Sequence, residues 1–205
     1  MKGLGIKNEG CMDASMLPID EHTKLIGTAI TVETQNGDNF PIHVAVYQGK
    51  PGYVMVVDGK GFVECSYMGD LIGGAAQAVG YNGIVVDGLV RDRLSLKEMG
   101  FPVFSKGYIQ RGPSKVGPGK INHPISCAGV DVQPGDLVVG DADGVTIVPK
   151  HRIEEVFAAA EKKLDYEIKR KITIDEYCAM AKAGKPAPQL APQWVEEMLL
   201  KKNPV

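Results

Sequence analysis

Three residues, Asp70, Arg91 and Asp92, have side chains that could together bind a metal ion and a small acid. Twenty residues, 71–90, separate Asp70 from the Arg91-Asp92 pair. Carboxylate oxygens are ligands that Mg²⁺ prefers, and a guanidinium group binds carboxylates and oxyanions. These residue types therefore indicate a site for a hard cation and a carboxylate-bearing substrate, provided that the fold brings them together.

The segment between these residues predicts one helix followed by one buried strand. Residues 70–79 are rich in alanine, and residues 83–88 form an apolar run that ends in Asp-Gly. Such a run is typical of a strand that is buried on both faces. A helix and a strand in this order return the chain to the edge of the sheet where the helix began. We therefore expect the three side chains to lie beside the free N–H groups of the helix start, which attract anions.

Each of these residues also has a purely structural interpretation. Asp70 is a good N-cap for the helix that follows it, and Arg91-Asp92 could form a surface turn after the strand. The pair Gly73-Gly74 lies inside the predicted helix. Each of its glycines costs about 1 kcal/mol relative to alanine, which indicates close packing at that point.

The rest of the chain predicts a single mixed α/β domain over residues 1–205. Strands are expected at 25–34 (before the turn pattern Gln35-Asn-Gly-Asp-Asn39), at 52–59, at 101–105 and as a hairpin over 133–149. A short helix is expected at 94–99, a C-terminal helix over about 151–171, and a proline-containing tail over 182–205. Residues 41–48 fit a helix or a strand, and residues 107–124 fit an extended loop or a hairpin.

The predicted C-terminal helix carries one carboxylate in an unusual position. An apolar stripe follows the helical period through Ile153, Val156, Phe157, Ala160, Leu164 and Ile168, and Glu167 falls inside it. A carboxylate on a packing face is disfavoured unless it has a partner. Glu167 therefore forms a salt bridge, lies where the helix frays, or is delivered to an active site, including one in a neighbouring subunit.

Composition excludes several classes of function. The net charge of −2 gives no reason to expect direct binding to nucleic acid, and no apolar run is long enough to cross a membrane. Residues 1–9 lack the apolar core of a signal peptide, so we expect a cytoplasmic protein. The cysteines are widely spaced and are expected to be free thiols: Cys11, Cys65, Cys127 and Cys178. Motifs for phosphate loops, dinucleotide or adenosyl cofactors and serine nucleophiles are missing from the sequence, and the four histidines lack metal-ligand spacing.

From Lys24 to Pro149 the chain resembles one known family. The matching motifs are Leu25–Val32, Gly69-Asp70-Leu71, Gly83–Asp92 and Pro134–Val145. This family contains regulator of ribonuclease activity A and the 4-hydroxy-4-methyl-2-oxoglutarate / 4-carboxy-4-hydroxy-2-oxoadipate aldolases, whose signature is Asp-x20-Arg-Asp. The resemblance implies an α/β sandwich around a small β-barrel, related to swivelling phosphohistidine domains. It also implies homotrimers or homohexamers with sites between subunits.

The resemblance assigns a role to each matching residue. Asp92 would bind Mg²⁺ (or Mn²⁺) directly, and Asp70 would hold a metal-bound water. Arg91 would contact the oxo or hydroxyl oxygen of a 2-oxo acid substrate, beside the substrate-binding segment Gly69, Asp70, Leu71 and Ile72. Within that segment, the N–H groups of Leu71 and Ile72 would receive the pyruvyl carboxylate. Glu167 matches, more loosely, a family glutamate that comes from the adjacent subunit, and it is the candidate base.

The implied reaction is that of a class II pyruvate aldolase, a carbon–carbon lyase, with oxaloacetate decarboxylation as an expected side activity. The alternative is a non-catalytic regulator that binds ribonuclease E. Demethylmenaquinone methyltransferase activity is disfavoured, because an adenosyl-cofactor motif is missing. The chain departs from the family in two places, since it lacks the usual N-terminal helix before Gly10 and has a longer tail from Lys182.

Overall fold

The computed structural model describes residues 10–202. Residues 1–9, on which the expectations about a signal peptide and the family's N-terminal helix rest, lie outside the described residues. The chain divides into two compact units, the first ending at Glu154 and the second beginning at Glu155. None of the described helices is long and apolar enough to cross a membrane.

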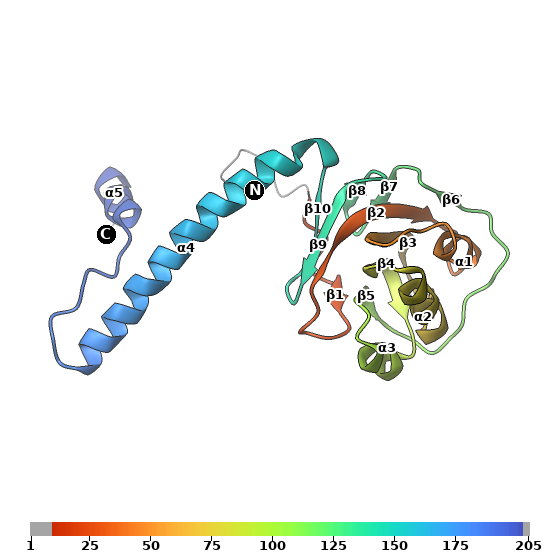
Figure 1. Cartoon of the computed structure of the whole chain (residues 1–205), viewed down its shortest axis with the longest axis horizontal. Coiled ribbons are helices and arrows are strands. Elements are labelled where there is room, and N and C mark those ends of the chain that lie inside the picture. Colours follow the sequence, from red (N-terminus) through yellow and green to blue (C-terminus); the bar gives the residue numbers. More distant parts are fainter. Residues whose placement is uncertain (1–9, 203–205) are drawn as a thin grey trace. The chain divides into compact units, whose positions relative to one another are not determined.

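The first unit is built on four parallel strands joined by three helices (Figure 1). The strands are β2 (Leu25–Glu33), β3 (Tyr53–Ser66), β4 (Gly83–Val90) and β5 (Val103–Tyr108), and they lie in the order β5-β4-β3-β2. The connecting helices are α1 (Phe40–Val46), α2 (Asp70–Val79) and α3 (Arg93–Met99). The predicted helix at 70–79 is thus confirmed, and the ambiguous segment at 41–48 is mainly helical.

Antiparallel strands extend this sheet on both sides. On one side, β1 (Leu17–Pro18) pairs with β5; on the other, β9 (Leu137–Asp141) pairs with β2, and β10 (Gly144–Val148) pairs with β9. The predicted hairpin is confirmed. The segment 107–124 is mainly an extended loop, which ends in β6 (Lys120–Ile121) beside β2. A separate hairpin joins β7 (Ile125–Cys127) to β8 (Val130–Val132).

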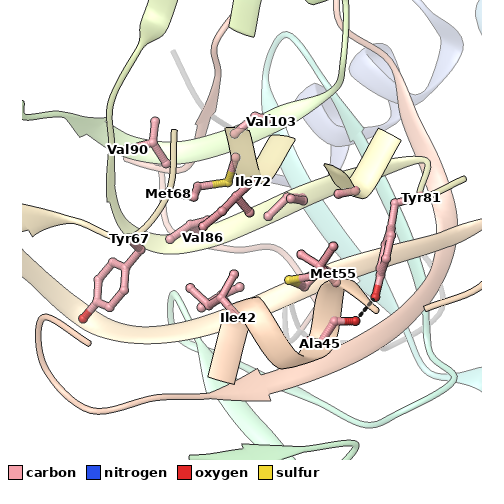
Figure 2. Packing of buried hydrophobic residues seen from close by; sticks show 14 of the residues in the cluster. Ile42, Ala45, Met55, Tyr67, Met68, Ile72, Tyr81, Val86, Val90 and Val103 are labelled. Carbon is pink, nitrogen blue, oxygen red and sulfur yellow. Dashed lines mark hydrogen bonds between the residues drawn. The ribbon is translucent and has the colours of Figure 1, made fainter. Parts of the chain in front are cut away.

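The sheet curls into a nearly closed barrel, which confirms the expected mixed α/β class with a small β-barrel (Figure 1). The curl separates two buried apolar clusters. Met16, Val56 and Phe104 belong to the cluster of the curled sheet and the β7–β8 hairpin. Ile42, Met55 and Ile72 belong to the cluster between the sheet and the helices (Figure 2). Residues 54–59 of β3 and 83–88 of β4 are buried, as the apolar runs predicted.

Packing between the helices explains one of the two adjacent glycines. A Cβ on Gly73 would lie 2.7 Å from Leu96 of α3, so α2 and α3 approach each other there. A Cβ on Gly74 would lie 3.6 Å from Met99, which is an ordinary contact. Close packing is therefore confirmed at Gly73, whereas a larger side chain such as alanine would fit at position 74.

The sequence predicts that two strands end at the Asp-Gly pairs 58–59 and 87–88, and this prediction is wrong. Strands β3 and β4 continue through them with irregular register. Buried Asp58 pairs with Lys60 at 2.7 Å, and buried Asp87 pairs with Lys106 at 2.7 Å. Ion pairing allows both carboxylates to stay inside the sheet instead of forming an exposed turn.

The second unit contains helices α4 (Ile153–Lys182) and α5 (Gln193–Lys202). Helix α4 continues past residue 171, and the tail contains a helix that the sequence analysis did not predict. Among the described residues, none of the side chains of α4 is buried, and the apolar stripe is open at Phe157, Leu164 and Ile168.

Candidate metal and anion site

Asp70, Arg91 and Asp92 come together at the ends of strands β3 and β4. Asp70 is the first residue of α2, which follows β3, and Arg91-Asp92 follows β4 directly. The backbone N–H of Asp70 donates a hydrogen bond to Asp92 Oδ2 at 3.2 Å, and Arg91 Nε lies 3.4 Å from the same oxygen. The structure therefore brings the Arg91 and Asp92 side chains to the backbone N–H of Asp70, and a role for the Asp70 carboxylate stays a prediction.

Gly69 makes this approach possible because it has no side chain. A Cβ at position 69 would lie 2.0 Å from Asp92 Oδ2 and 2.9 Å from Arg91 Cγ. The backbone of Gly69 is extended (φ −144°, ψ −159°), a conformation that other residues also adopt. Space, rather than backbone freedom, is therefore what requires glycine at this position.

The backbone of Asp92 is held in an unusual conformation. Its φ of 56° and ψ of 40° lie in the left-handed region, and Asp92 is the N-cap residue of α3. Aspartate and asparagine enter this region more readily than most other residues, although the conformation still costs about 1 kcal/mol. The carbonyl of Asp92 accepts the N–H of Leu96, which begins α3. This turn directs the carboxylate back toward α2.

The N-terminus of α2 offers further N–H groups. Its N-cap residue is Gly69 and not Asp70, so the structural interpretation of Asp70 as a capping side chain is wrong. The first hydrogen bond within the helix runs from Gly73 N–H to Gly69 O, so the N–H groups of Leu71 and Ile72 precede the hydrogen-bonded part of the helix. Such groups attract anions. Leu71 is exposed and Ile72 is buried.

The carboxylates fit a hard divalent cation. The Asp92 side chain keeps 36% of its surface exposed, and its hydrogen bond and ion pair both engage Oδ2. Asp70 is partly exposed. In the described part of the chain, His, Cys, Asp and Glu form no group of three or more that could hold a metal. A cation bound here would therefore keep several water or substrate oxygens, which is common for Mg²⁺.

A loop covering residues 109–119 forms one wall of the site. A Cβ on Gly112 would lie 3.1 Å from Arg91 Nη1, so the loop runs directly against the guanidinium group. The carbonyl of Arg111 accepts both the N–H and the Oγ–H of Ser66. These contacts position the loop beside the end of β3.

The buried carboxylate of Asp38 anchors the same loop. It accepts hydrogen bonds from Ser114 Oγ at 2.7 Å, Val116 N–H at 2.6 Å and Gly117 N–H at 3.1 Å. Burial opposes its ionisation, but these bonds outweigh that effect and lower the pKa of Asp38 below its usual value. The sequence analysis missed this role, because Asp38 is only part of a turn pattern there.

Glu167 lies in the second unit, on α4. Its side chain is exposed and pairs with Lys163, four residues earlier, at 3.5 Å. This pair matches the salt-bridge interpretation of the sequence. The assignment of Glu167 to the site stays a prediction.

Comparison with known proteins identifies relatives of the whole first unit. The family model RraA-like, described as Aldolase/RraA, matches residues 2–147. A protein of Halalkalibacterium halodurans named "Putative 4-hydroxy-4-methyl-2-oxoglutarate aldolase" is 41% identical over 170 residues, covering 82% of this chain and 81% of its own length.

Solved structures agree with this result. Streptomyces coelicolor RraAS2, from the RNase ES inhibitor RraA family, has a TM-score of 0.75 and 27% identity, covering 83% of this chain and 88% of its own. A Geobacillus kaustophilus protein described as S-adenosylmethionine: 2-dimethylmenaquinone methyltransferase has a TM-score of 0.65 and 29% identity, covering 69% and 86%. The chain therefore belongs to the RraA-like family of aldolases and RraA proteins.

Proposed function

We propose that this protein is a divalent-metal-dependent pyruvate aldolase that cleaves 4-hydroxy-2-oxo acids of the 4-hydroxy-4-methyl-2-oxoglutarate type. The observation that carries the proposal is the convergence of Asp92, Arg91 and the start of α2 around one carboxylate oxygen. The relative from Halalkalibacterium halodurans supports the substrate class through its name.

The chain's own residues have distinct tasks in this proposal. Asp92 would hold Mg²⁺ or Mn²⁺ directly, and Asp70 would hold a water bound to it. The N–H groups of Leu71 and Ile72 would bind the substrate carboxylate, and Arg91 would face the 2-oxo oxygen. When bound, the cation supplies Lewis acidity toward the 2-oxo group.

Cleavage of the C3–C4 bond leaves negative charge on the pyruvate enolate, which the guanidinium of Arg91 would stabilise. The C4 hydroxyl loses its proton in the same reaction, and C4 becomes a carbonyl carbon. Glu167 is the family's candidate for the proton acceptor and would reach the site from a neighbouring subunit of a trimer or hexamer. The exposed apolar side chains of Phe157, Leu164 and Ile168 on α4 favour such an assembly.

Pyruvate release coupled to a reporter enzyme tests this proposal. The substrates are 4-hydroxy-4-methyl-2-oxoglutarate and oxaloacetate, each with Mg²⁺, with Mn²⁺ and with EDTA. We expect metal-dependent turnover of both, because decarboxylation of oxaloacetate passes through the same enolate. Turnover that is insensitive to EDTA would contradict the metal requirement.

The second candidate function is regulation of ribonuclease E without catalysis. It is supported by the likeness to Streptomyces coelicolor RraAS2. A pull-down with purified ribonuclease E, read beside the pyruvate assay, separates the two functions.

A further inference from the structure

An open pocket lies in the second unit, between the end of α4 and the segment that follows it. Its volume is about 710 Å³. The residues of α4 that line it recur at the helical period on one face, namely Glu176, Ala179, Met180 and Ala183. Residues 185–188 form the opposite wall. Six of these eight residues are alanine, proline or methionine, so the pocket is mainly apolar.

The way in which α4 ends accounts for this pocket. Gly184 adopts the left-handed conformation (φ 63°), and the N–H of Lys185 donates to the carbonyl of Met180 at 3.0 Å. This pattern is a common helix stop. Pro186 follows and cannot continue the helix. The chain therefore turns beside the last turns of α4, where the short side chains of Ala179 and Ala183 leave space.

Helix α5 carries an apolar face that the described residues leave largely uncovered. This face follows the helical period and consists of Trp194, Val195, Met198 and Leu199. Trp194 is 58% exposed, Met198 41% and Leu199 51%. Tryptophan is enriched among the residues that contribute most to protein–protein binding. A helix with such a face normally packs against another surface, and Trp194 is the natural anchor.

The chain's own α5 does not fill the pocket. Gln189 Nε2 donates a hydrogen bond to Glu196, and the N–H of Val195 donates to the carbonyl of Pro192 at 2.9 Å. These bonds tie the start of α5 to the linker that precedes it. Prolines stiffen the linker, which contains three of them over residues 183–192. With α5 held in this way, Trp194 stays exposed and the pocket stays open.

The charges around the two surfaces are complementary. Glu176 and Lys185 both line the pocket, and α5 carries Glu197 near its start and Lys201 near its end. An α5 that runs antiparallel to α4 places Lys201 toward Glu176 and Glu197 toward Lys185. Exposed ion pairs of this kind add little affinity, but they favour one orientation of the docked helix.

We propose that α5 of a second copy of this chain docks into the pocket at the end of α4, with Trp194 as its central side chain. An amphipathic helix in an apolar groove is a common mode of recognition. Every copy presents both surfaces, so the exchange is reciprocal or closes around a ring of copies. The proposal is independent of the aldolase reaction, because it involves no residue of the first unit.

The fluorescence of Trp194 tests this proposal directly, because Trp194 is the only tryptophan in the chain. An indole ring emits at longer wavelength in water than in an apolar pocket. For the unaltered protein we expect emission at shorter wavelength than for the urea-unfolded protein. Light scattering should give a mass above the 22.0 kDa of one chain. Both measurements use the protein without substitution.

A substitution in the pocket should release the tryptophan. Ala183→Glu places a longer, charged side chain among the lining residues, and we expect the emission to move to the wavelength of the unfolded protein. The matched control is Ala181→Glu, because Ala181 is exposed on α4 and is not among the residues that line the pocket. It should keep the emission of the unaltered protein. Circular dichroism checks that both variants retain their helices.

Mixing two variants distinguishes a second copy from the chain's own α5. Trp194→Phe has an open pocket and no tryptophan, whereas Ala183→Glu has the tryptophan and a blocked pocket. After the two are unfolded and refolded together, with Trp194→Phe in excess, the tryptophan finds an open pocket only on another copy. We expect the emission to return to shorter wavelength. A mixing partner that carries both substitutions should give no recovery.

Three results would overturn the proposal. Emission from the unaltered protein at the wavelength of the unfolded protein would show that the pocket does not hold Trp194. A blocked pocket that leaves the emission unchanged would place Trp194 elsewhere. A shift that mixing fails to restore, or a mass of one chain, would assign the pocket to the chain's own α5.

Discussion

The carboxylate of Asp92 caps the start of α2 by accepting the backbone N–H of Asp70 at 3.2 Å. One carboxylate thus joins the ends of two neighbouring parallel strands, β3 and β4. Its negative charge also faces the positive end of the α2 helix dipole. The hydrogen bond between the Asp70 N–H and Asp92 therefore links the start of α2 to the proposed metal site.

Gly69→Ala should disrupt this arrangement. The added Cβ would lie 2.0 Å from Asp92 Oδ2, so the carboxylate and Arg91 must move. We expect metal-dependent pyruvate release to fall by at least about 100-fold, since positions at such sites tolerate only small displacements.

Gly74→Ala is the matched control for this change. Gly74 lies inside α2, five residues after Gly69, and its Cβ would meet only Met99, at 3.6 Å. We expect unchanged activity and a gain in the free energy of unfolding of about 0.5–1 kcal/mol, because alanine favours helix. Equal losses of activity in the two variants would show that the Gly69 effect does not come from the crowding of Asp92.

Asp38→Asn should loosen the wall of the site. The amide removes the charge that Ser114, Val116 and Gly117 hydrogen-bond. We expect a loss of about 1–3 kcal/mol in the free energy of unfolding at pH 7 and a higher KM, because the loop borders Arg91.

The sign of the pH dependence follows from the lowered pKa of Asp38. The stabilisation is present above the unfolded pKa of about 3.9 and is lost as pH falls through the lower folded value. Urea unfolding of both proteins between pH 7 and pH 3 checks this. A difference that grows on acidification would contradict it.

The sequence was sufficient to predict the elements that position the site. The alanine-rich segment 70–79 and the apolar run at 83–88 have distinct patterns, and their order places Asp70 and Asp92 at one edge of the sheet. The prediction succeeds here because the periodicity that distinguishes a helix from a strand depends on residues close together in the sequence.

The contributions of distant segments could not be predicted in this way. Asp38 contacts the loop 76 or more residues away, and its sequence context indicates only a turn. The pairing of Asp87 with Lys106 likewise keeps a carboxylate inside β4, at the Asp-Gly pair where the sequence predicted the end of the strand.

Lys106→Met should destabilise the fold without touching the site. Asp87 would lose the cation that lies 2.7 Å away, and its side chain is only 9% exposed. We expect a loss of about 3 kcal/mol at pH 8, which is typical when one member of a buried pair is removed.

High pH tests the same pair. Burial lowers the pKa of Lys106, but hydrogen bonds and ion pairs with Asp87 and Asp13 outweigh this and raise it above 10.5. The stabilisation is therefore present below the unfolded pKa and is lost as pH rises through the folded value. The difference in the free energy of unfolding between the unaltered protein and Lys106→Met should be smaller at pH 11 than at pH 8. The tyrosines, which also ionise at high pH, are the same in both proteins and do not contribute to this difference. A constant gap would contradict the expectation.

The most direct test of the account is the metal dependence of Asp92→Asn. Asparagine is isosteric, tolerates the left-handed backbone at φ 56° and can still accept the Asp70 N–H, so the fold should persist. The measurement is Mg²⁺-dependent release of pyruvate from 4-hydroxy-4-methyl-2-oxoglutarate, beside a thermal melt. The account predicts a metal-dependent rate in the unaltered protein and its loss in the variant, by at least about 100-fold, with little change in Tm. An Asp92→Asn protein that keeps the full Mg²⁺-dependent rate would contradict the account.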